Sequence, residues 1–237
     1  MLKTRRPLLA ILVFSLGACA KLGPGRGMRA QGALYYLEPA QVQMAGFPAA
    51  PPAESEVDKA DLAALRQLQL KRSQADCDRA RSEADASYEE FFSALRPLVK
   101  PLPPRAGEIF LRMKADTDAA VDAVKRRYKR ERPFRRDSGL EPCLGRVGGY
   151  AYPSGHAALS RLYGRVLSDL DPGRKAEFMA RADEAAWDRV LGGVHHPSDV
   201  EAGKRLGDAL YDDMRRSPSF RADMETLRRS LAPRQGP

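Results

Sequence analysis

Long apolar runs, histidine and cysteine are all scarce in this sequence of 237 residues. A mean hydropathy of -0.48 and 30% charged residues exclude a polytopic membrane protein. The 43% of hydrophobic residues excludes wholesale disorder, because it is enough to build one substantial core. The net charge of +9 is a modest excess that suits anionic substrates or an anionic surface.

No segment alternates apolar and polar residues as a half-buried strand does, and no internal repeat is visible. Apolar residues instead recur every three or four positions, which is the period of amphipathic helices. The expected helices are one from Ser55, one carrying Cys77 to Leu95 that Pro97 stops, one carrying Phe110 to Tyr128, one from Ser154 to about Asp171, one carrying Phe178 to Arg189, one from Pro197 or Ser198, and a short one after Ser217. The pattern indicates an all-α, single-domain bundle of about seven helices.

Residues 1–19 have the layout of a bacterial signal peptide. Three basic residues precede the apolar run Leu8–Leu16, which is far shorter than the roughly 20 residues that a spanning helix needs. Leu16–Cys19 is similar to a lipobox, in which Cys19 would become the lipidated first residue. Ala18–Ala20 also fits a cleavage site that would release a soluble product. We therefore expect an exported protein, either periplasmic or anchored to the outer membrane as a lipoprotein.

Residues 20–54 are rich in glycine and proline, which is typical of a tether without regular structure. Within this range Leu34–Pro39 is a short apolar and aromatic segment that we expect to dock in extended form. The folded domain is expected to span 55–237.

The cysteines predict a disulfide. If Cys19 is lipidated, Cys77 and Cys143 remain as an even pair in an oxidising compartment. A disulfide between them would be worth about 3–4 kcal/mol, because it closes a long loop. Two separate buried thiols are the alternative.

Candidate catalytic groups are concentrated in Arg189–Asp199, which holds two of the three histidines. Arg189 could bind a phosphate through two parallel N–H bonds. His195 could act as nucleophile or base, and Asp199 could orient it. Arg189 continues the apolar face of its helix, so it needs an anionic partner. The alternative is an ordinary helix–turn–helix junction with the Gly-Gly pair as C-cap and Pro197 at the first helical position.

Two other stretches carry candidate anion ligands. In Pro153-Ser-Gly-His the free N–H groups of Ser154 and Gly155 could bind an oxyanion beside His156, although the stretch could also be an ordinary helix cap. Lys125 and Arg132 are seven residues apart, so both could project from one face near a helix end.

Eight of the twelve residues from Lys125 to Arg136 are basic. Most of them are interpreted as a solvated basic face: Arg126, Arg127, Lys129, Arg130, Arg135 and Arg136. Without interleaved stacking aromatics or a known module, the run does not indicate nucleic acid as a specific ligand.

In chain order the three stretches read Lys-x6-Arg-Pro, Pro-Ser-Gly-His and Arg-x5-His-x3-Asp. This order resembles the three-part signature of the PAP2 phosphatase superfamily, which includes the vanadium haloperoxidases. Leu34–Pro39, the Pro-Pro-Ala stretch at 51–53, Arg132–Phe134 and the helical C-terminus look similar to class A bacterial non-specific acid phosphatases. The resemblance covers nearly everything after the leader. It implies hydrolysis of small phosphomonoesters, with inorganic phosphate as product and vanadate as an inhibitor.

The resemblance also implies a role for each matched residue. Charge on the equatorial oxygens of the transferred phosphoryl group would be held by five residues, Lys125, Arg132, Ser154, Gly155 and Arg189. His195 would attack phosphorus to form a phosphohistidine, Asp199 would fix its tautomer, and His156 would protonate the leaving alcohol. Fixed cations would replace Mg²⁺, so no metal and no other cofactor is expected. The scarcity of histidine agrees with this expectation.

Asp188 departs from the family, which usually has serine immediately before the arginine of the third motif. A carboxylate facing the phosphate would repel the substrate. We expect Asp188 instead to point away around the helix and brace a neighbouring cation.

Three other functions fit the same residues. They are a phosphatase of lipid phosphates, a vanadate-dependent haloperoxidase, and a degenerate surface lipoprotein that only binds phosphate. Contact with a membrane is expected only through the lipid anchor, and a homo-oligomer is possible.

Overall fold

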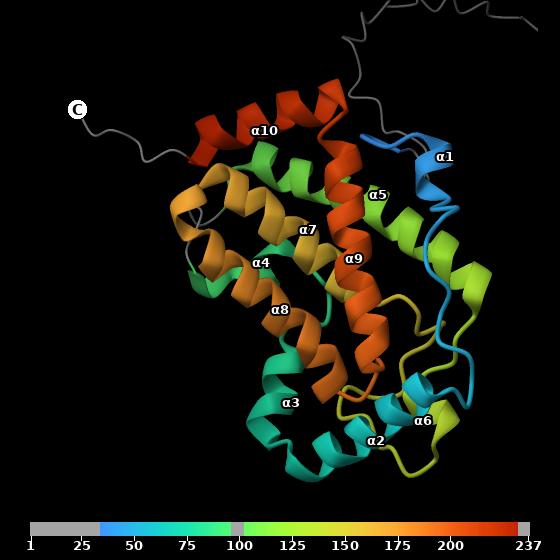
Figure 1. The fold of residues 1–237 in the computed structure, drawn as a ribbon. Coiled ribbons are helices and arrows are strands. Elements are labelled where there is room, and N and C mark those ends of the chain that lie inside the picture. Colours follow the sequence, from blue (N-terminus) through green and yellow to red (C-terminus); the bar gives the residue numbers. More distant parts are fainter. Residues whose placement is uncertain (1–33, 96–101, 232–237) are drawn as a thin grey trace, which may run out of the picture. The chain divides into compact units, whose positions relative to one another are not determined.

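The computed structural model describes residues 34–95 and 102–231 (Figure 1). The predicted signal peptide with Cys19, the first part of the tether and Pro97 lie outside the described residues. Helices without any strand make up the described ranges, so the prediction of an all-α fold is confirmed. Within these ranges no helix combines the length and apolarity needed to cross a bilayer.

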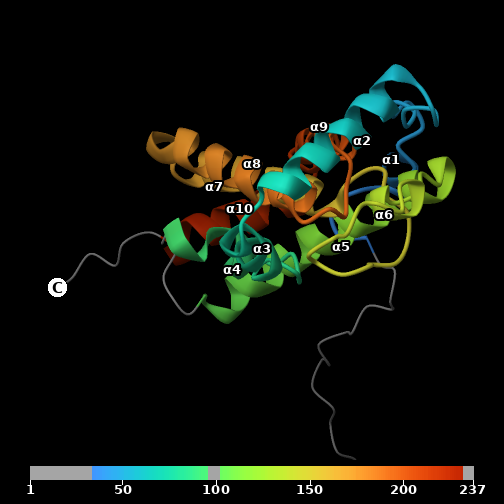
Figure 2. The same cartoon turned by 90° about the horizontal axis from the view of Figure 1, so that it is seen from below.

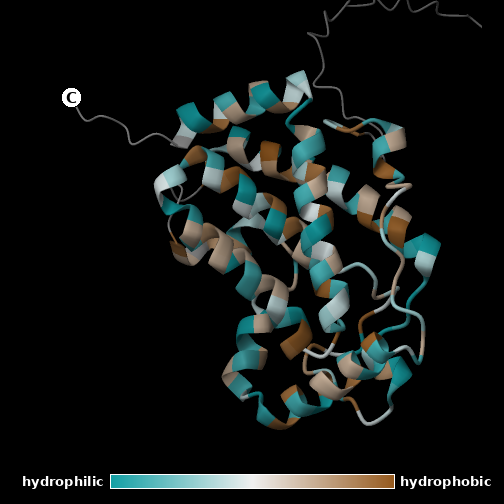
Figure 3. Ribbon diagram, viewed as in Figure 1, coloured by the Kyte–Doolittle hydropathy of each residue, from teal (hydrophilic) through white to brown (hydrophobic). Residues whose placement is uncertain are grey.

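The described ranges contain α1 (Pro39–Val42), α2 (Glu56–Lys71), α3 (Gln74–Arg81), α4 (Tyr88–Phe92), α5 (Pro104–Tyr128), α6 (Pro133–Arg136), α7 (Gly155–Leu170), α8 (Lys175–Leu191), α9 (Pro197–Met214) and α10 (Pro218–Leu231). Two 3-10 segments, η1 (Ser93–Leu95) and η2 (Pro172–Arg174), complete them. The helices carry both hydrophobic and hydrophilic residues, as amphipathic helices do (Figure 3).

Helix α7 lies at the centre of the bundle. It packs along α8 and α9 and also contacts α5 (Figure 1). Its residues are buried on most faces, including Leu159, Leu162 and Val166. The first turns of α9 also contact α2 (Figure 2). Because the sequence motifs lie at the ends of these helices, their packing determines where the motifs meet.

Two glycines allow the close approach of α9 to α7. A Cβ atom at Gly203 would overlap the carbonyl oxygen of Ser154, and one at Gly207 would overlap the carbonyl oxygen of Ala158. Neither backbone oxygen can move without disturbing α7. The small residues therefore fix the distance between the start of α7 and the start of α9.

The single helix predicted from Cys77 to Leu95 is wrong. Helix α3 ends at Arg81 and α4 begins at Tyr88, with a turn between them. The Ser82 hydroxyl donates to the carbonyl oxygen of Arg79, the Ser87 hydroxyl accepts from the N–H of Glu90, and Ala86 has a φ of 51°. Serine side chains that bond nearby backbone compete with a continuing helix. The buried period is interrupted at the break, because Ala84, which continues the apolar spacing in the sequence, is exposed.

The N-terminal segment docks on the core as expected, although Pro39–Val42 forms a short helix. The buried carboxylate of Asp116 in α5 accepts the N–H groups of Tyr35, Tyr36 and Leu37 at 2.8–3.0 Å. One side chain thus satisfies three consecutive donors that lie outside regular structure.

A disulfide joins Cys77 of α3 to Cys143, which are 66 positions apart in sequence. The same loop is held by Arg81, whose guanidinium donates to the carbonyl oxygen of Cys143 at 2.9 Å. The predicted bond is therefore present, and it connects the α3–α4 region to the loop that leads to α7.

Candidate active site

The predicted site residues lie at helix ends. Lys125 is in the last turn of α5, Ser154 is the N-cap of α7, and Arg189 is in the last turn of α8. His195 lies in the turn before α9, and Asp199 is in the first turn of that helix. Helix ends are where backbone groups lack intrahelical partners, so they are suited to ligand contacts.

Arg132 does not share a helix face with Lys125, contrary to the prediction. Helix α5 ends at Tyr128 because Lys129 takes the left-handed conformation, with a φ of 48°. Arg132 follows in extended conformation as the N-cap of α6. Arg132 still lies close enough to Lys125 for its charge to lower the pKa of the Lys125 ammonium group.

The Gly-Gly pair forms the sharp turn between α8 and α9. Gly193 has a φ of 77°, and a Cβ there would come within 3.0 Å of the Pro142 backbone. The N–H groups of Val194 and His195 both donate to the carbonyl oxygen of Arg189, at 3.2 and 3.3 Å. The turn therefore holds His195 directly above the last turn of α8. The stretch is both a helix–turn–helix junction and a cluster of reactive side chains.

The His195 ring lies between a cation and an anion. Its Nε2 is 2.8 Å from Nη1 of Arg132, and its Nδ1 is 3.5 Å from Oδ2 of Asp199. A guanidinium can only donate, so Nε2 is the acceptor and the ring proton is on Nδ1, facing Asp199. Burial, together with the charge of Arg132, lowers the pKa of His195 well below its usual value. His195 is therefore neutral, with the Nε2 lone pair on the side of the cations.

Asp199 is closer to His196 than to His195. Its Oδ2 accepts the backbone N–H of His196 at 2.8 Å and faces Nδ1 of the same residue at 2.9 Å. Its Oδ1 accepts from Arg130 at 2.7 Å. Burial opposes ionisation of Asp199, but the contacts with His195 and His196 hold its pKa well below the usual range. Asp199 is thus an ionised, anchored carboxylate, and the 3.5 Å approach to His195 is of a length that catalytic hydrogen bonds often show before substrate binds.

His156 has one ring nitrogen committed to the protein. Its Nε2 lies 3.1 and 3.2 Å from the carbonyl oxygens of Glu83 and Ala84, in the turn between α3 and α4. Because carbonyl oxygens only accept, Nε2 carries the proton and Nδ1 remains for a substrate. Burial and the neighbouring charge of Arg189 lower the pKa of His156 to about 3. The turn between α3 and α4, which the sequence pattern did not predict, therefore orients the His156 ring.

Three cations of the motifs have no ion pair among the described residues. Lys125 donates to the carbonyl oxygen of Tyr150 at 2.5 Å, Arg132 to those of Val194 and Gly148, and Arg189 only to that of Ala80 at 3.4 Å. Burial and the mutual repulsion with Arg132 lower the pKa of Lys125 to about 8 and that of Arg189 to about 10.

These cations differ from most arginines of the described chain, which contact carboxylates directly. The sequence predicted that a buried Arg189 needs an anionic partner, and no carboxylate of the described ranges lies within ion-pair distance of it. The Nε atoms of Arg132 and Arg189 are buried without any hydrogen-bond partner. Buried like charges that lie close together without partners are costly, so the arrangement favours an anion as ligand.

The start of α7 is tied to the start of α9. The N–H of Ser154 donates to the carbonyl oxygen of Asp199 at 2.9 Å, and its hydroxyl caps the N–H of Ala157 at 3.3 Å. Gly155 is the first residue of α7, so its N–H has no intrahelical partner. The prediction that the N–H of Ser154 is free for an oxyanion is therefore wrong, because that group is bonded to the third motif, and the N–H of Gly155 is the predicted backbone donor that remains.

Asp188 faces away from the cations of the motifs. Its two oxygens accept from the guanidinium of Arg79 in α3, at 2.8 Å from Nη2 and 2.9 Å from Nε. The Asp188 side chain is only 1% exposed. The expectation that Asp188 braces a neighbouring cation therefore agrees with its contacts.

The interpretation of Arg130 as part of a solvated face is wrong. Its side chain is 6% exposed and contacts Asp58 and Asp61 of α2 as well as Asp199.

His196 is the second residue that sequence reasoning missed. One local signal was available for His196, because a polar residue before a proline, followed by an acid at the third helical position, is typical of a capping box. For Arg130 the only signal was the i, i+3 pair of aspartates on α2.

Comparisons with known proteins return one group of relatives. A non-specific acid phosphatase of Providencia stuartii is 26% identical, and the alignment covers 92% of this chain and 93% of the relative. A non-specific acid phosphatase of Salmonella typhi is 31% identical over 64% of this chain and 65% of its own length. No protein-family model matches the sequence.

The fold also has a known counterpart. The crystal structure of a bacterial vanadium-dependent iodoperoxidase superposes with a TM-score of 0.56 at 20% identity, covering 72% of this chain and 51% of the other. Among the described residues, no group of three or more His, Cys, Asp or Glu is placed to hold a metal ion.

Proposed function

We propose that the chain is a non-specific acid phosphatase of the superfamily of PAP2 phosphatases and vanadium haloperoxidases, and that it hydrolyses phosphomonoesters through a phosphohistidine on His195. The names of its relatives support phosphatase activity. The observation that carries the proposal is the set of cations without an ion pair in the described ranges, Lys125, Arg132 and Arg189, beside a neutral histidine whose Nε2 accepts from Arg132 until a phosphate takes up that guanidinium. A phosphate monoester supplies the missing negative charge.

In the proposed reaction the three cations bind the non-bridging oxygens of the substrate. Nε2 of His195 attacks phosphorus, and the developing imidazolium is stabilised by ionised Asp199 across the Nδ1 proton. His156, through Nδ1, gives a proton to the leaving alcohol oxygen. It then takes a proton from the water that hydrolyses the phosphohistidine, so acid and base roles alternate on one ring.

The electrostatics of the two rings favour activity at acidic pH. Since the pKa of His195 lies well below its usual value, the nucleophile stays neutral in acid. Since the pKa of His156 is lowered to about 3, Nδ1 of this ring carries its proton, the second on the ring, only at low pH, even though a bound phosphate would raise the pKa. Activity should therefore fall as the pH rises towards neutrality.

The test separates the two histidines by the leaving group. His195→Ala should lose turnover of both aryl and alkyl phosphates by several orders of magnitude, and no phosphoenzyme should be trapped. His156→Ala should lose alkyl phosphates far more than aryl phosphates, because a phenolate leaves without a proton. The trapped phosphoryl group should be labile in acid and stable in base, as a phosphohistidine is. Near-normal turnover in His195→Ala would defeat the mechanism.

We also propose that the protein is exported and carries a lipid on Cys19. The bonded pair Cys77 and Cys143 supports an oxidising compartment. Labelling of growing cells with a radioactive fatty acid should mark the wild-type chain and not Cys19→Ser. Equal labelling of both, or of neither, would contradict the lipid anchor.

A further inference from the structure

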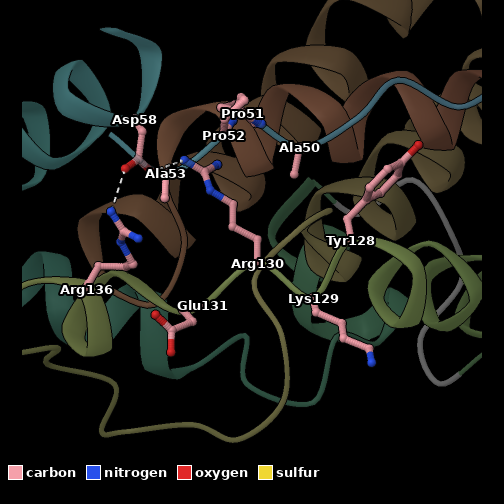
Figure 4. Close-up of a pocket in the computed structure, with 10 residues that line it drawn as sticks. All are labelled: Ala50, Pro51, Pro52, Ala53, Asp58, Tyr128, Lys129, Arg130, Glu131 and Arg136. Atoms are coloured by element: carbon pink, nitrogen blue, oxygen red, sulfur yellow. Dashed lines mark hydrogen bonds and ion pairs between the residues drawn. The ribbon is translucent and has the colours of Figure 1, made fainter. Parts of the chain in front are cut away.

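Arg130 connects helix α2 to the candidate catalytic carboxylate. One edge of its guanidinium, Nη1, donates to Oγ of Ser198 at 2.6 Å and to Oδ1 of Asp199 at 2.7 Å. The other nitrogen, Nη2, donates to Asp58 at 3.0 Å and to Asp61 at 2.9 Å. Figure 4 shows the Arg130 side chain directed at Asp58, whereas its neighbour Lys129 points away. A single planar group thus spans two helices.

The ion pairs around Arg130 are not explained by a contribution to the free energy of folding. Three buried carboxylates surround this guanidinium, and only Asp58 has a second cation, Arg136, at 2.9 Å. Buried ion clusters are often no more stable than apolar residues of the same volume, because each charge must be taken out of water. The cluster is therefore better explained by the geometry that it imposes on its members than by a gain in folding stability.

The geometry imposed is that of Asp199. With Oδ1 held by Arg130 and Oδ2 held by the backbone N–H of His196, the carboxylate cannot rotate about its Cβ–Cγ bond. Oδ2 is therefore kept on the side of His195. Ser198, which Arg130 also contacts, bonds Asp61 through its own N–H at 3.2 Å, so the whole first turn of α9 is tied to α2.

We propose that Arg130 is a positioning residue for phosphoryl transfer, which fixes the orientation of Asp199 and through it the angle of the His195 ring. The proposal rests on the proposed function of His195. Arg130 itself does not touch the substrate. Lysine cannot replace it, because one ammonium group cannot contact both Asp199 and the aspartates of α2 in the fork geometry of a guanidinium.

The test compares two variants that differ only at Arg130. Arg130→Met alone would leave three carboxylates facing one another, so the substitution is made in the background Asp58→Asn/Asp61→Asn. The asparagines keep an oxygen that can accept from Ser198 and carry no charge. The control is Arg136→Met, which removes a cation that contacts Asp58 and Glu54 but not Asp199.

The expected result is a split between kcat and binding. Relative to the double-asparagine background, adding Arg130→Met should lower kcat by about 10- to 100-fold, the loss typical of a reacting group displaced by about 1 Å. The inhibition constant of inorganic phosphate should change by less than about twofold, since the three cations that bind it are untouched. Arg130→Lys in the same background should recover only part of kcat, and Arg136→Met should stay near wild type.

A second readout does not depend on activity. The sequence has only three histidines, so ring-nitrogen NMR of an untagged, histidine-labelled protein can be assigned by single substitutions. Adding Arg130→Met should move the Nδ1–H signal of His195 and leave the Nε2–H signal of His156 in place. An unchanged His195 signal, an unchanged kcat, or a fall in kcat matched by equal loss of phosphate binding would each overturn the proposal. If the wild-type protein hydrolyses no phosphomonoester, the proposed function fails, and the NMR comparison alone decides the role of Arg130.

Discussion

Replacing Asp188 by serine, the residue usual in the family, tests whether this carboxylate faces the substrate or the protein. The structure predicts that Asp188→Ser destabilises the fold and leaves the KM for an aryl phosphate within about twofold of wild type. Both oxygens of Asp188 are occupied by Arg79, and the carboxylate is directed at α3. Serine cannot reach Arg79, and it removes a charge that faces Arg79 and not the substrate.

The magnitude follows from the exposure of the two partners. Hydrogen bonds to charged groups contribute about 1.5–3 kcal/mol when both partners are buried. The Arg79 side chain is 37% exposed, so water can solvate the freed guanidinium and the cost is reduced. We expect a loss of about 1–2 kcal/mol, which corresponds to a fall in Tm of roughly 2–8 °C for a domain of this size.

The assay combines a thermal melt with steady-state kinetics on the same preparations. Glu184→Gln is the matched control, because Glu184 also approaches Arg79, at 3.7 Å, but is 50% exposed. A surface pair of this kind is worth less than about 1 kcal/mol, so the control should melt close to wild type. A tenfold or larger fall in KM for Asp188→Ser, without a fall in Tm, would refute the reasoning and show that Asp188 repels the phosphate.

Three further predictions concern other parts of the molecule. Because the pKa of Lys125 is lowered to about 8, the wild-type KM should rise as the pH increases above this value and Lys125 loses its charge, whereas Lys125→Arg should keep a flat KM in a pH series. Reduction of the disulfide should lower the free energy of unfolding by about 4 kcal/mol in urea titrations, and Cys143→Ser should be insensitive to reductant. Gly203→Ala should lower both kcat and Tm, at a cost of about 1–3 kcal/mol, because the new Cβ separates α9 from α7. Gly107→Ala, where a Cβ meets nothing within 4 Å, should do neither, and equal effects at both glycines would contradict the packing argument.

Comparison of the predictions with the structure shows which kinds of inference depend on local pattern. The helices that carry the motifs were predicted because apolar residues recur at the helical period, and this period is a property of neighbouring residues. The same reasoning joined α3 and α4, because apolar residues recur at the helical spacing on both sides of the turn, although the serines of the turn end the helix. Local pattern therefore predicted that helices exist better than it predicted where they end.

In the candidate site too, the sequence predicted which residues matter but not what each of them contacts. The three motifs named Lys125, Arg132, His156, Arg189 and His195 as a set, and the structure brings their charges close enough to alter one another's pKa. Their roles in catalysis stay predictions until the kinetic tests are made. The motifs contained no information on what surrounds each side chain.

What the sequence alone determined is the all-helical fold and the set of candidate anion-binding side chains, because helical period and motif spacing are read along the chain. Tertiary structure decided which charges are paired. Arg130 meets Asp199 across 69 positions, and Arg79 meets Asp188 across 109. The sequence records a basic residue in the same way whether its side chain lies in water or among carboxylates. Only the packing of distant helices determines which cations are neutralised by the protein and which remain for a phosphate.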